Sequence, residues 1–132
     1  MSRELQALLT IFDAKAEAAT GTPQDVSKYR HLVLQFATAS SANLTVKFQG
    51  SVQDTCPDFS AAQTATNNWD YIQVKDLQSG SSINGDTGVS PAGTDDFRLF
   101  ELNTNLLKWV CATITTRAAG SLTLKLCVSE GV

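Results

Sequence analysis

Charged side chains are scarce in this sequence. Asp, Glu, Lys and Arg make up 17% of its 132 residues, whereas soluble domains average about 25%. The formal net charge of -3 gives no basic excess for a phosphate backbone, so we expect no nucleic-acid partner. The polar surface must consist mainly of Ser, Thr, Asn and Gln. Such a surface costs little to desolvate, which suits a large contact with other proteins and equally suits a simple low-charge β protein.

Long hydrophobic runs are also missing. No apolar stretch approaches the roughly 18 residues that a membrane-spanning helix needs, and the opening Met-Ser-Arg-Glu has no secretory pattern, so we expect synthesis in a cytoplasm and no membrane contact. Cys56, Cys111 and Cys127 have no Cys-x-x-Cys spacing. An odd number of cysteines without metal-ligand spacing predicts reduced thiols, with no zinc site and no disulfide framework.

Residues suited to catalysis or metal binding are few. His31 is the only histidine and has no recognisable partner motif, and no Gly-x-Ser-x-Gly or phosphate-cradling motif is present. Asp86, Asp95 and Asp96 lie in or near a Gly-rich segment that could hold calcium, but solvated turn aspartates are more common and the spacing is not that of an EF-hand. The sequence therefore predicts no enzyme, no cofactor and no metal.

Alternation of polar and apolar residues predicts an all-β fold. Strands are expected at 32–36, 44–48, 69–77 and 97–102 and in the segment 107–128, with polar turn-rich segments between them. The expected architecture is an antiparallel β-sandwich, jelly-roll-like, with seven or eight strands in a single domain over residues 13–132. The expected core stripe consists of Leu32, Leu34, Phe36, Leu44, Val46, Phe48, Ile114, Leu124 and Leu126.

The last third of the chain predicts a β-hairpin with a defined register. Residues 118–120 suit a three-residue loop in which Gly120 adopts the left-handed conformation. That loop sets Cys111 directly opposite Cys127 on the outer face, with Trp109 beside them. An apolar spot on the outside of a sheet predicts a cover, supplied by a second subunit, another partner or the N-terminal segment.

The N-terminal segment predicts a docking arm over residues 1–12. Residues 3–9 suit a short helix that is too short to be stable alone, and residues 10–18 alternate partly like a strand. The long polar segment 50–68 is also expected to reach a neighbour. The predicted interface residues are Leu5, Leu8, Leu9, Ile11, Trp109, Cys111 and Cys127.

Three segments give a family resemblance. They run His31-Leu-Val-Leu-Gln-Phe-Ala-Thr through Lys47-Phe-Gln-Gly-Ser, Asn68-Trp-Asp-Tyr-Ile-Gln-Val-Lys-Asp-Leu with Ile83-Asn-Gly-Asp-Thr-Gly-Val, and Phe97-Arg-Leu-Phe-Glu-Leu-Asn-Thr-Asn through Trp109-Val-Cys-Ala-Thr. In this order they resemble small virion structural proteins of tailed bacteriophages, nearest the capsid decoration, or cement, proteins. The likeness spans residues 29–128 and rests on no short motif.

The resemblance implies a function without chemistry. A decoration protein of this kind would form a homotrimer on the outer surface of a phage head, after synthesis in the bacterial cytoplasm. It would bind the major capsid protein and clamp neighbouring capsomers, and the resemblance carries over no catalytic residue.

Two alternatives stay open. Trp69, Tyr71 and Trp109 could stack on sugars, as aromatic residues of carbohydrate-binding β-sandwich modules do. The chain could also be another accessory protein of a phage head or tail. An enzyme explains the sequence least.

Overall fold

The described residues form strands and turns only. The computed structural model describes residues 7–91, 94–102 and 106–130, and within these ranges nine strands form one antiparallel sheet. The described ranges hold no helix long and apolar enough to cross a membrane. The all-β, antiparallel prediction is confirmed, with nine strands where seven or eight were expected.

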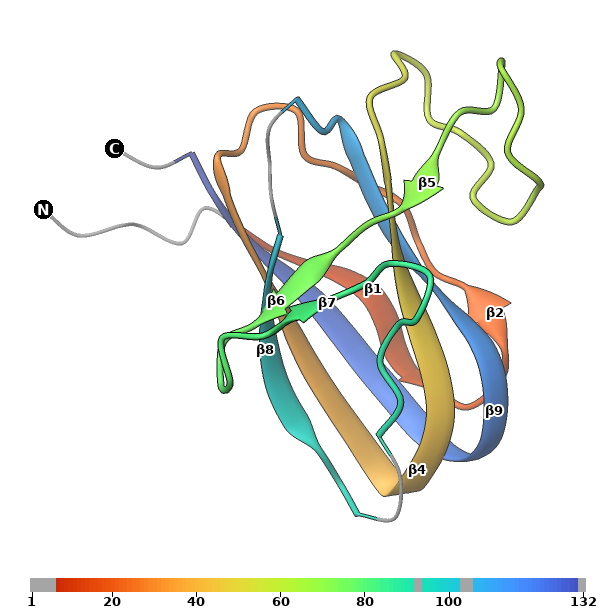
Figure 1. The fold of residues 1–132 in the computed structure, drawn as a ribbon, viewed down its shortest axis with the longest axis vertical. Helices are drawn as coiled ribbons and strands as arrows, with labels where there is room; N and C mark the ends of the chain where they lie inside the picture. The colour runs from red at the N-terminus through yellow and green to blue at the C-terminus, as the bar shows by residue number, and fades with distance from the viewer. Residues whose placement is uncertain (1–6, 92–93, 103–105, 131–132) are drawn as a thin grey trace, which may run out of the picture.

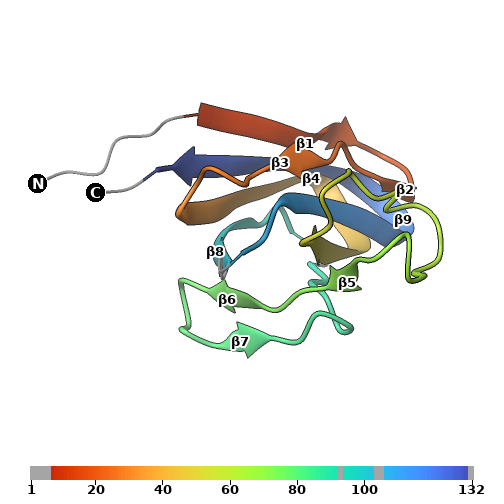
Figure 2. The same cartoon turned by 90° about the horizontal axis from the view of Figure 1, so that it is seen from above.

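The strands follow one another along the chain with loops of very different length (Figure 1). They are β1 (Ala7–Lys15), β2 (Ala19–Thr20), β3 (Gln24–Asp25), β4 (His31–Ser51), β5 (Asp70–Tyr71), β6 (Val74–Asp76), β7 (Ser82–Ile83), β8 (Phe97–Leu102) and β9 (Trp109–Ser129). In the sheet their order is β1-β9-β4-β8-β6-β7; β2 and β3 also pair with β9, and β5 pairs with β4. Figure 2 shows β1 and β7 at opposite edges.

Two long strands determine the shape of the molecule. β4 and β9 have 21 residues each and pair antiparallel from end to end, with His31 opposite Ser129 and Ser51 opposite Trp109. Both strands bend near the middle and turn back at the same end of the molecule (Figure 1). A strand that bends in this way can pass from one layer of a fold to the other. One hydrogen-bonded sheet thereby encloses a core from two sides.

The two layers have different neighbours. The first layer holds residues 31–39 of β4 and 121–129 of β9, flanked by β1 and β8. The second layer holds residues 43–51 of β4 and 109–117 of β9, flanked by the short strands β2, β3 and β5. Because both layers belong to one sheet, the pairing differs from the two separate sheets of the predicted jelly-roll-like sandwich.

The predicted C-terminal hairpin is wrong. Gly120 does adopt a left-handed φ of 76°, but the arms on either side of it pair with β4 and not with each other. Cys111 lies opposite Gln49, and Cys127 lies opposite Val33. Alternation of polar and apolar residues fixes which side chains face the core. It does not distinguish two arms that hydrogen-bond to each other from two arms that lie in different layers and touch only through core side chains. The strands expected at 32–36 and 44–48 are likewise two arms of the single strand β4, and both pair with β9.

The predicted core stripe is confirmed. All nine of its residues are buried between the two layers. Phe100 of β8 joins them, with its ring centroid 5.6 Å from that of Phe36 and 5.7 Å from that of Phe48. The predicted strand at 97–102 coincides with β8, whereas the predicted strand at 69–77 is divided into β5 and β6.

β1 takes the place of the predicted helix and arm over the residues it covers. It pairs with β9, with Ala7 opposite Val128 and Leu9 opposite Leu126, and it crosses the expected boundary at residue 12. Ile11 and Phe12 are buried in the core. The edge of β9 offers a ladder of backbone hydrogen bonds, which a seven-residue helix could not replace. Leu5 lies outside the described residues.

Candidate interaction surfaces

The outer face of the second layer is covered by the chain itself. The covering loop, residues 52–69, buries Phe59 and Trp69 against Cys111. The ring centroids of Phe59 and Trp69 are 6.0 Å apart, and Tyr71 meets Trp69 edge-on at 5.1 Å. Of the predicted apolar spot, Cys111 and Trp109 lie under this loop, whereas Cys127 lies in the other layer. The cover over Cys111 is a loop of the same chain and not the N-terminal segment.

Hydrogen bonds from side chains to backbone carbonyls hold the covering loop in place. The Gln49 side-chain amide donates to the carbonyl of Phe59 at 2.9 Å, and the Ser51 hydroxyl donates to the carbonyl of Asn68 at 2.6 Å. The Trp69 indole N–H donates to the carbonyl of Ala61 at 3.1 Å. These donors reach loop carbonyls that would otherwise lose water without gaining a partner.

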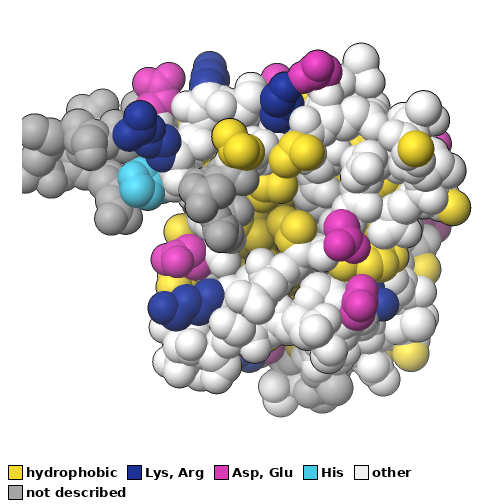
Figure 3. Space-filling model, turned by 45° about the horizontal axis from the view of Figure 1, so that its top comes forward, with side chains coloured by type: hydrophobic (Ala, Val, Ile, Leu, Met, Phe, Trp, Pro, Cys, Tyr) yellow, Lys and Arg dark blue, Asp and Glu magenta, His cyan; other side chains and the backbone are white. Residues whose placement is uncertain are grey.

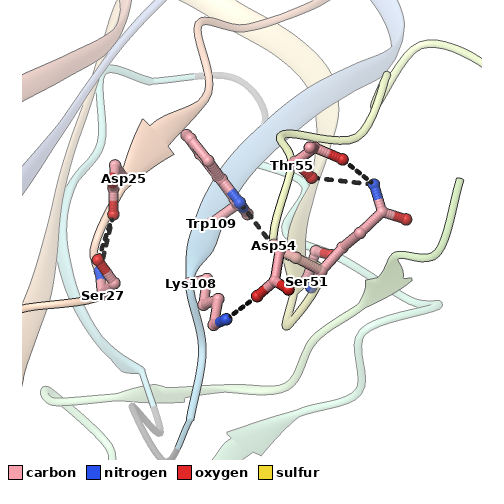
Figure 4. Close-up of polar contacts among 8 residues, drawn as sticks. Asp25, Ser27, Ser51, Asp54, Thr55, Lys108 and Trp109 are labelled. Carbon is pink, nitrogen blue, oxygen red and sulfur yellow. Dashed lines mark hydrogen bonds and ion pairs between the residues drawn. The ribbon is translucent and has the colours of Figure 1, made fainter.

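The start of the covering loop is tied to the start of β9 (Figure 4). The indole N–H of Trp109 donates to the carbonyl of Gln53 at 3.0 Å, and Lys108 forms an ion pair with Asp54. The Lys108 ammonium also lowers the pKa of the Asp54 carboxyl. Trp109, a predicted interface residue, thus serves as an anchor within its own chain.

The two outer faces give their cysteines different environments. Burial raises the pKa of the Cys111 thiol to about 12. Cys127, on the outer face of the first layer, is half-buried, and its pKa is raised in the same direction by burial. Both thiols are free, as is that of Cys56. The predicted cross-strand pair of Cys111 and Cys127 is wrong, because the two residues lie in different layers.

A pocket of about 430 Å³ lies at the margin of the covering loop. Its lining holds no charged residue, and the side-chain oxygen of Gln49 there has no hydrogen-bond partner among the described atoms. The lining consists of Ala18, Ala19, Thr20, Gln49, Phe59, Ser60, Ala61, Ala62, Gln63, Trp69, Tyr71, Thr113 and Ile114.

A second hollow lies at the end of the molecule opposite the bend. Hydrophobic side chains gather there between charged ones (Figure 3). A pocket of about 580 Å³ is lined by Ile72 and Leu107 together with polar residues of β6, β7 and β8. A Cβ atom added at Gly50 would lie 3.0 Å from each of these two side chains, so glycine lets them pack closely over β4.

The outer face of the first layer is bare among the described residues. We call it the open face. It is formed by the outward-pointing residues of β1, β9, β4, β8 and β6, together with Leu77, which follows β6. Its members are Leu8, Thr10, Val33, Gln35, Ala37, Lys75, Leu77, Phe97, Leu99, Glu101, Thr123, Lys125 and Cys127.

The open face exposes large apolar side chains. Phe97 is 75% exposed, Leu99 48%, Leu8 44% and Leu77 43%. These are four of the six large hydrophobic residues exposed in the described part of the chain, and the other two, Val52 and Leu106, lie outside this face. Scattered apolar residues are ordinary on a protein surface, and their concentration on one face makes this face a candidate interaction surface.

Sequence reasoning missed the main contributors to this face. In β8, Phe97 and Leu99 point outward while Phe100 and Leu102 point inward, so the strand is apolar on both sides. Arg98 points to the inner side, where it forms ion pairs with the buried Asp76 and with Asp96. The pattern Phe-Arg-Leu-Phe-Glu-Leu was itself the available signal, because a strand with one wet face should alternate more cleanly.

The predicted interface residues divide into accessible and buried ones. Leu8 and Cys127 lie opposite each other on the open face. Leu9 is half-buried against the core. Ile11 and Cys111 are buried within the chain, so neither side chain can meet a partner while the protein is folded. These two assignments are therefore corrected.

The candidate metal and catalytic residues serve local structure. His31 begins β4 opposite Ser129. The Asp95 carboxylate accepts a hydrogen bond from the Ser41 backbone N–H at 3.1 Å, and Asp96 pairs with Arg98. Asp86 lies in the turn at Asn84, with its backbone N–H bonded to the Asn84 side chain. The described residues contain no group of three or more His, Cys, Asp or Glu placed to hold a metal ion.

Comparisons with known proteins give a structural likeness. No protein-family model matches the sequence, and no curated protein matches it. The structure is similar to the crystal structure of the SPBc2 prophage-derived protein YomS, with a TM-score of 0.61 over 93% of this chain and 91% of that chain. The two sequences are 18% identical, so the similarity establishes a shared fold.

Proposed function

We propose that this protein is a non-enzymatic structural protein of a tailed-bacteriophage particle, and that it decorates the outer surface of the capsid. The open face carries the proposal, because it exposes four large apolar side chains on a protein with little charge. The likeness to a prophage-derived protein supports a phage origin. Copies of the chain would contact one another and the major capsid protein, and so stabilise neighbouring capsomers.

Decoration of a particle suits a surface of this kind. Burying one large apolar side chain contributes roughly 1.5–3 kcal/mol before the cost of ordering the partners is subtracted. A few such side chains give a weak single contact. On a particle, many copies and several contacts per copy raise the overall strength through high effective concentration.

The decisive test is the composition of the particle. Virions of the phage or prophage that encodes the chain should contain it in many copies, as measured by mass spectrometry of purified particles. Electron cryo-microscopy should place it on the outer surface of the head. Its absence from purified virions would reject the proposal, and a position confined to the tail would reject the decoration role.

A carbohydrate-binding role is the second candidate. The uncharged pocket beside Trp69, with its aromatic neighbours and the unpartnered oxygen of Gln49, favours a neutral saccharide over a charged ligand. Trp69 is only 7% exposed, which leaves little of its ring available for stacking. A saturable change in tryptophan fluorescence with neutral oligosaccharides, lost in Gln49→Ala, would favour this role over the first.

A further inference from the structure

The open face carries three charged side chains, of which Lys125 and Glu101 lie on opposite sides of β4. Lys125 lies on β9 opposite Gln35, and Glu101 lies on β8 opposite Val33, one outward row further along. Neither side chain forms an ion pair with another residue in the described ranges. Lys75 lies beside Glu101 toward the rim of the face. Val33 and Gln35 of β4 lie between Lys125 and Glu101, and the apolar Leu99 and Phe97 precede Glu101 along β8.

We propose that the open face binds the open face of a second copy of this chain about a two-fold axis. The inference rests on the proposed function, since it names the partner of the surface that carries that function. In a two-fold contact the same surface patch serves both copies, so two opposite charges on either side of the axis meet each other twice. Lys125 and Glu101 form such a pair, whereas Lys75 lies toward the rim of the face.

The register defines where the axis would pass. The two-fold axis would lie in the plane of the contact and cross β4 obliquely between Val33 and Gln35. Rotation about it brings Lys125 of each copy toward Glu101 of the other, so the pair forms twice. The same rotation brings the two Phe97 side chains toward each other at one end of the contact. An entirely apolar partner would instead leave the Lys125 ammonium desolvated without compensation, which is costly.

The size of the face predicts a weak, reversible contact. Taking about 4.8 Å between strands and about 3.4 Å per residue, the face measures roughly 24 by 20 Å. That footprint is about half of the roughly 800 Å² that each partner contributes to a standard interface. We therefore expect free protein to be monomeric when dilute and dimeric at high micromolar concentration. The two-fold contact differs from the trimer that the family resemblance implies.

The test is sedimentation equilibrium with charge-swap variants of the full chain. Glu101→Lys and Lys125→Glu should each weaken dimerisation at least about tenfold, because each places like charges together twice. The double variant should return the dissociation constant to within about threefold of the unmodified protein. A double variant as weak as the single ones would overturn the paired geometry, whatever its cause.

Apolar variants provide an independent arm. Phe97→Ser should weaken the dimer, whereas Val52→Ser, a matched change at a 59% exposed position outside the face, should leave it unchanged. Circular dichroism and thermal unfolding confirm that each variant is folded. A protein that stays monomeric at about 1 mM, a trimer, or a dimer insensitive to Phe97→Ser would overturn the inference. The virion inventory separately decides the proposed function, so failure of one does not imply failure of the other.

Discussion

The outer faces of the two layers carry similar apolar residues but differ in what covers them. On the second layer, residues 52–69 fold over the face, and Cys111 loses all contact with solvent. On the first layer, Phe97 and Leu99 remain exposed. An antiparallel sheet commonly packs one face on the core and exposes a polar face to solvent, and neither outer face follows that pattern. In one case the chain supplies the cover, and in the other the described residues leave the apolar side chains exposed.

The contrast separates stability from assembly. Side chains under the covering loop belong to the folding unit, so their removal should change the free energy of unfolding. Side chains on the open face contribute little to folding, so their removal should change association alone. Each experiment below either breaks this division or sharpens it.

The largest effect is expected at Trp69. Trp69→Ala removes a buried ring and its hydrogen bond to Ala61, and should lower the free energy of unfolding by about 3–5 kcal/mol. Phe97→Ala, at a 75% exposed position, should stay within about 0.5 kcal/mol of the unmodified protein. Denaturant unfolding measures both variants. Equal losses would show that the open face is part of the folding unit after all.

The bend that joins the two layers should be the next most sensitive point. Gly120 and Gly80 have almost the same left-handed φ, 76° and 75°. A Cβ atom at Gly120 would lie 2.6 Å from the carbonyl oxygen of Ala39 and would press on Ala42, whereas one at Gly80 would meet nothing within 4 Å.

We expect Gly80→Ala to cost about 1–2 kcal/mol from backbone strain alone. Gly120→Ala should cost about 2–4 kcal/mol, because a steric clash adds to the same strain. Thermal or denaturant unfolding gives the two values. The difference between them measures how tightly the layers meet at the bend, and a difference near zero would contradict the close approach.

Two of the free cysteines, Cys111 and Cys127, allow the covered face and the open face to be tested separately. For Cys111 the test is the pH dependence of the free energy of unfolding. Unfolding frees the Cys111 thiol to ionise near its usual pKa of about 8.5, while in the folded protein its pKa is about 12. The unfolded chain therefore loses this proton first, and stability should fall as pH rises from the lower value toward the higher. The slope contributed is at most about 1.4 kcal/mol per pH unit.

Cys111→Ala should remove that part of the slope, which the difference between the two proteins' unfolding curves above pH 9 isolates. At pH 8 a thiol reagent should label Cys127 faster than Cys111 in the folded protein. Similar labelling rates for the two thiols would mean that the covering loop opens readily.

The smallest effects are expected where the covering loop begins. Trp109→Phe keeps an aromatic side chain, smaller than indole, but removes the donor to Gln53, and should cost about 0.5–1.5 kcal/mol. Asp54→Asn breaks the ion pair with Lys108 at an exposed carboxylate and should leave the free energy of unfolding unchanged within error. A larger loss for Asp54→Asn than for Trp109→Phe would reverse this ranking of the two ties.

The sequence by itself determined which side chains form the core. The alternating residues of β4 and β9 have the same inward positions in the structure as in the pattern, since side-chain direction along a strand depends only on local backbone geometry. The left-handed Gly120 and the bounds of β8 are equally local features, and both were predicted correctly.

Only the tertiary structure decided which strands pair and what covers each face. A bend at Gly120 allows a hairpin or a change of layer, and the choice depends on whether β4 lies alongside β9 over its whole length. That contact joins residues nearly 100 positions apart, such as His31 and Ser129. The cover over Cys111 also depends on a loop whose polar sequence gives no sign of where it packs. Strand pairing is non-local, because the hydrogen-bonding edge of one strand fits many others, and the whole core selects among them.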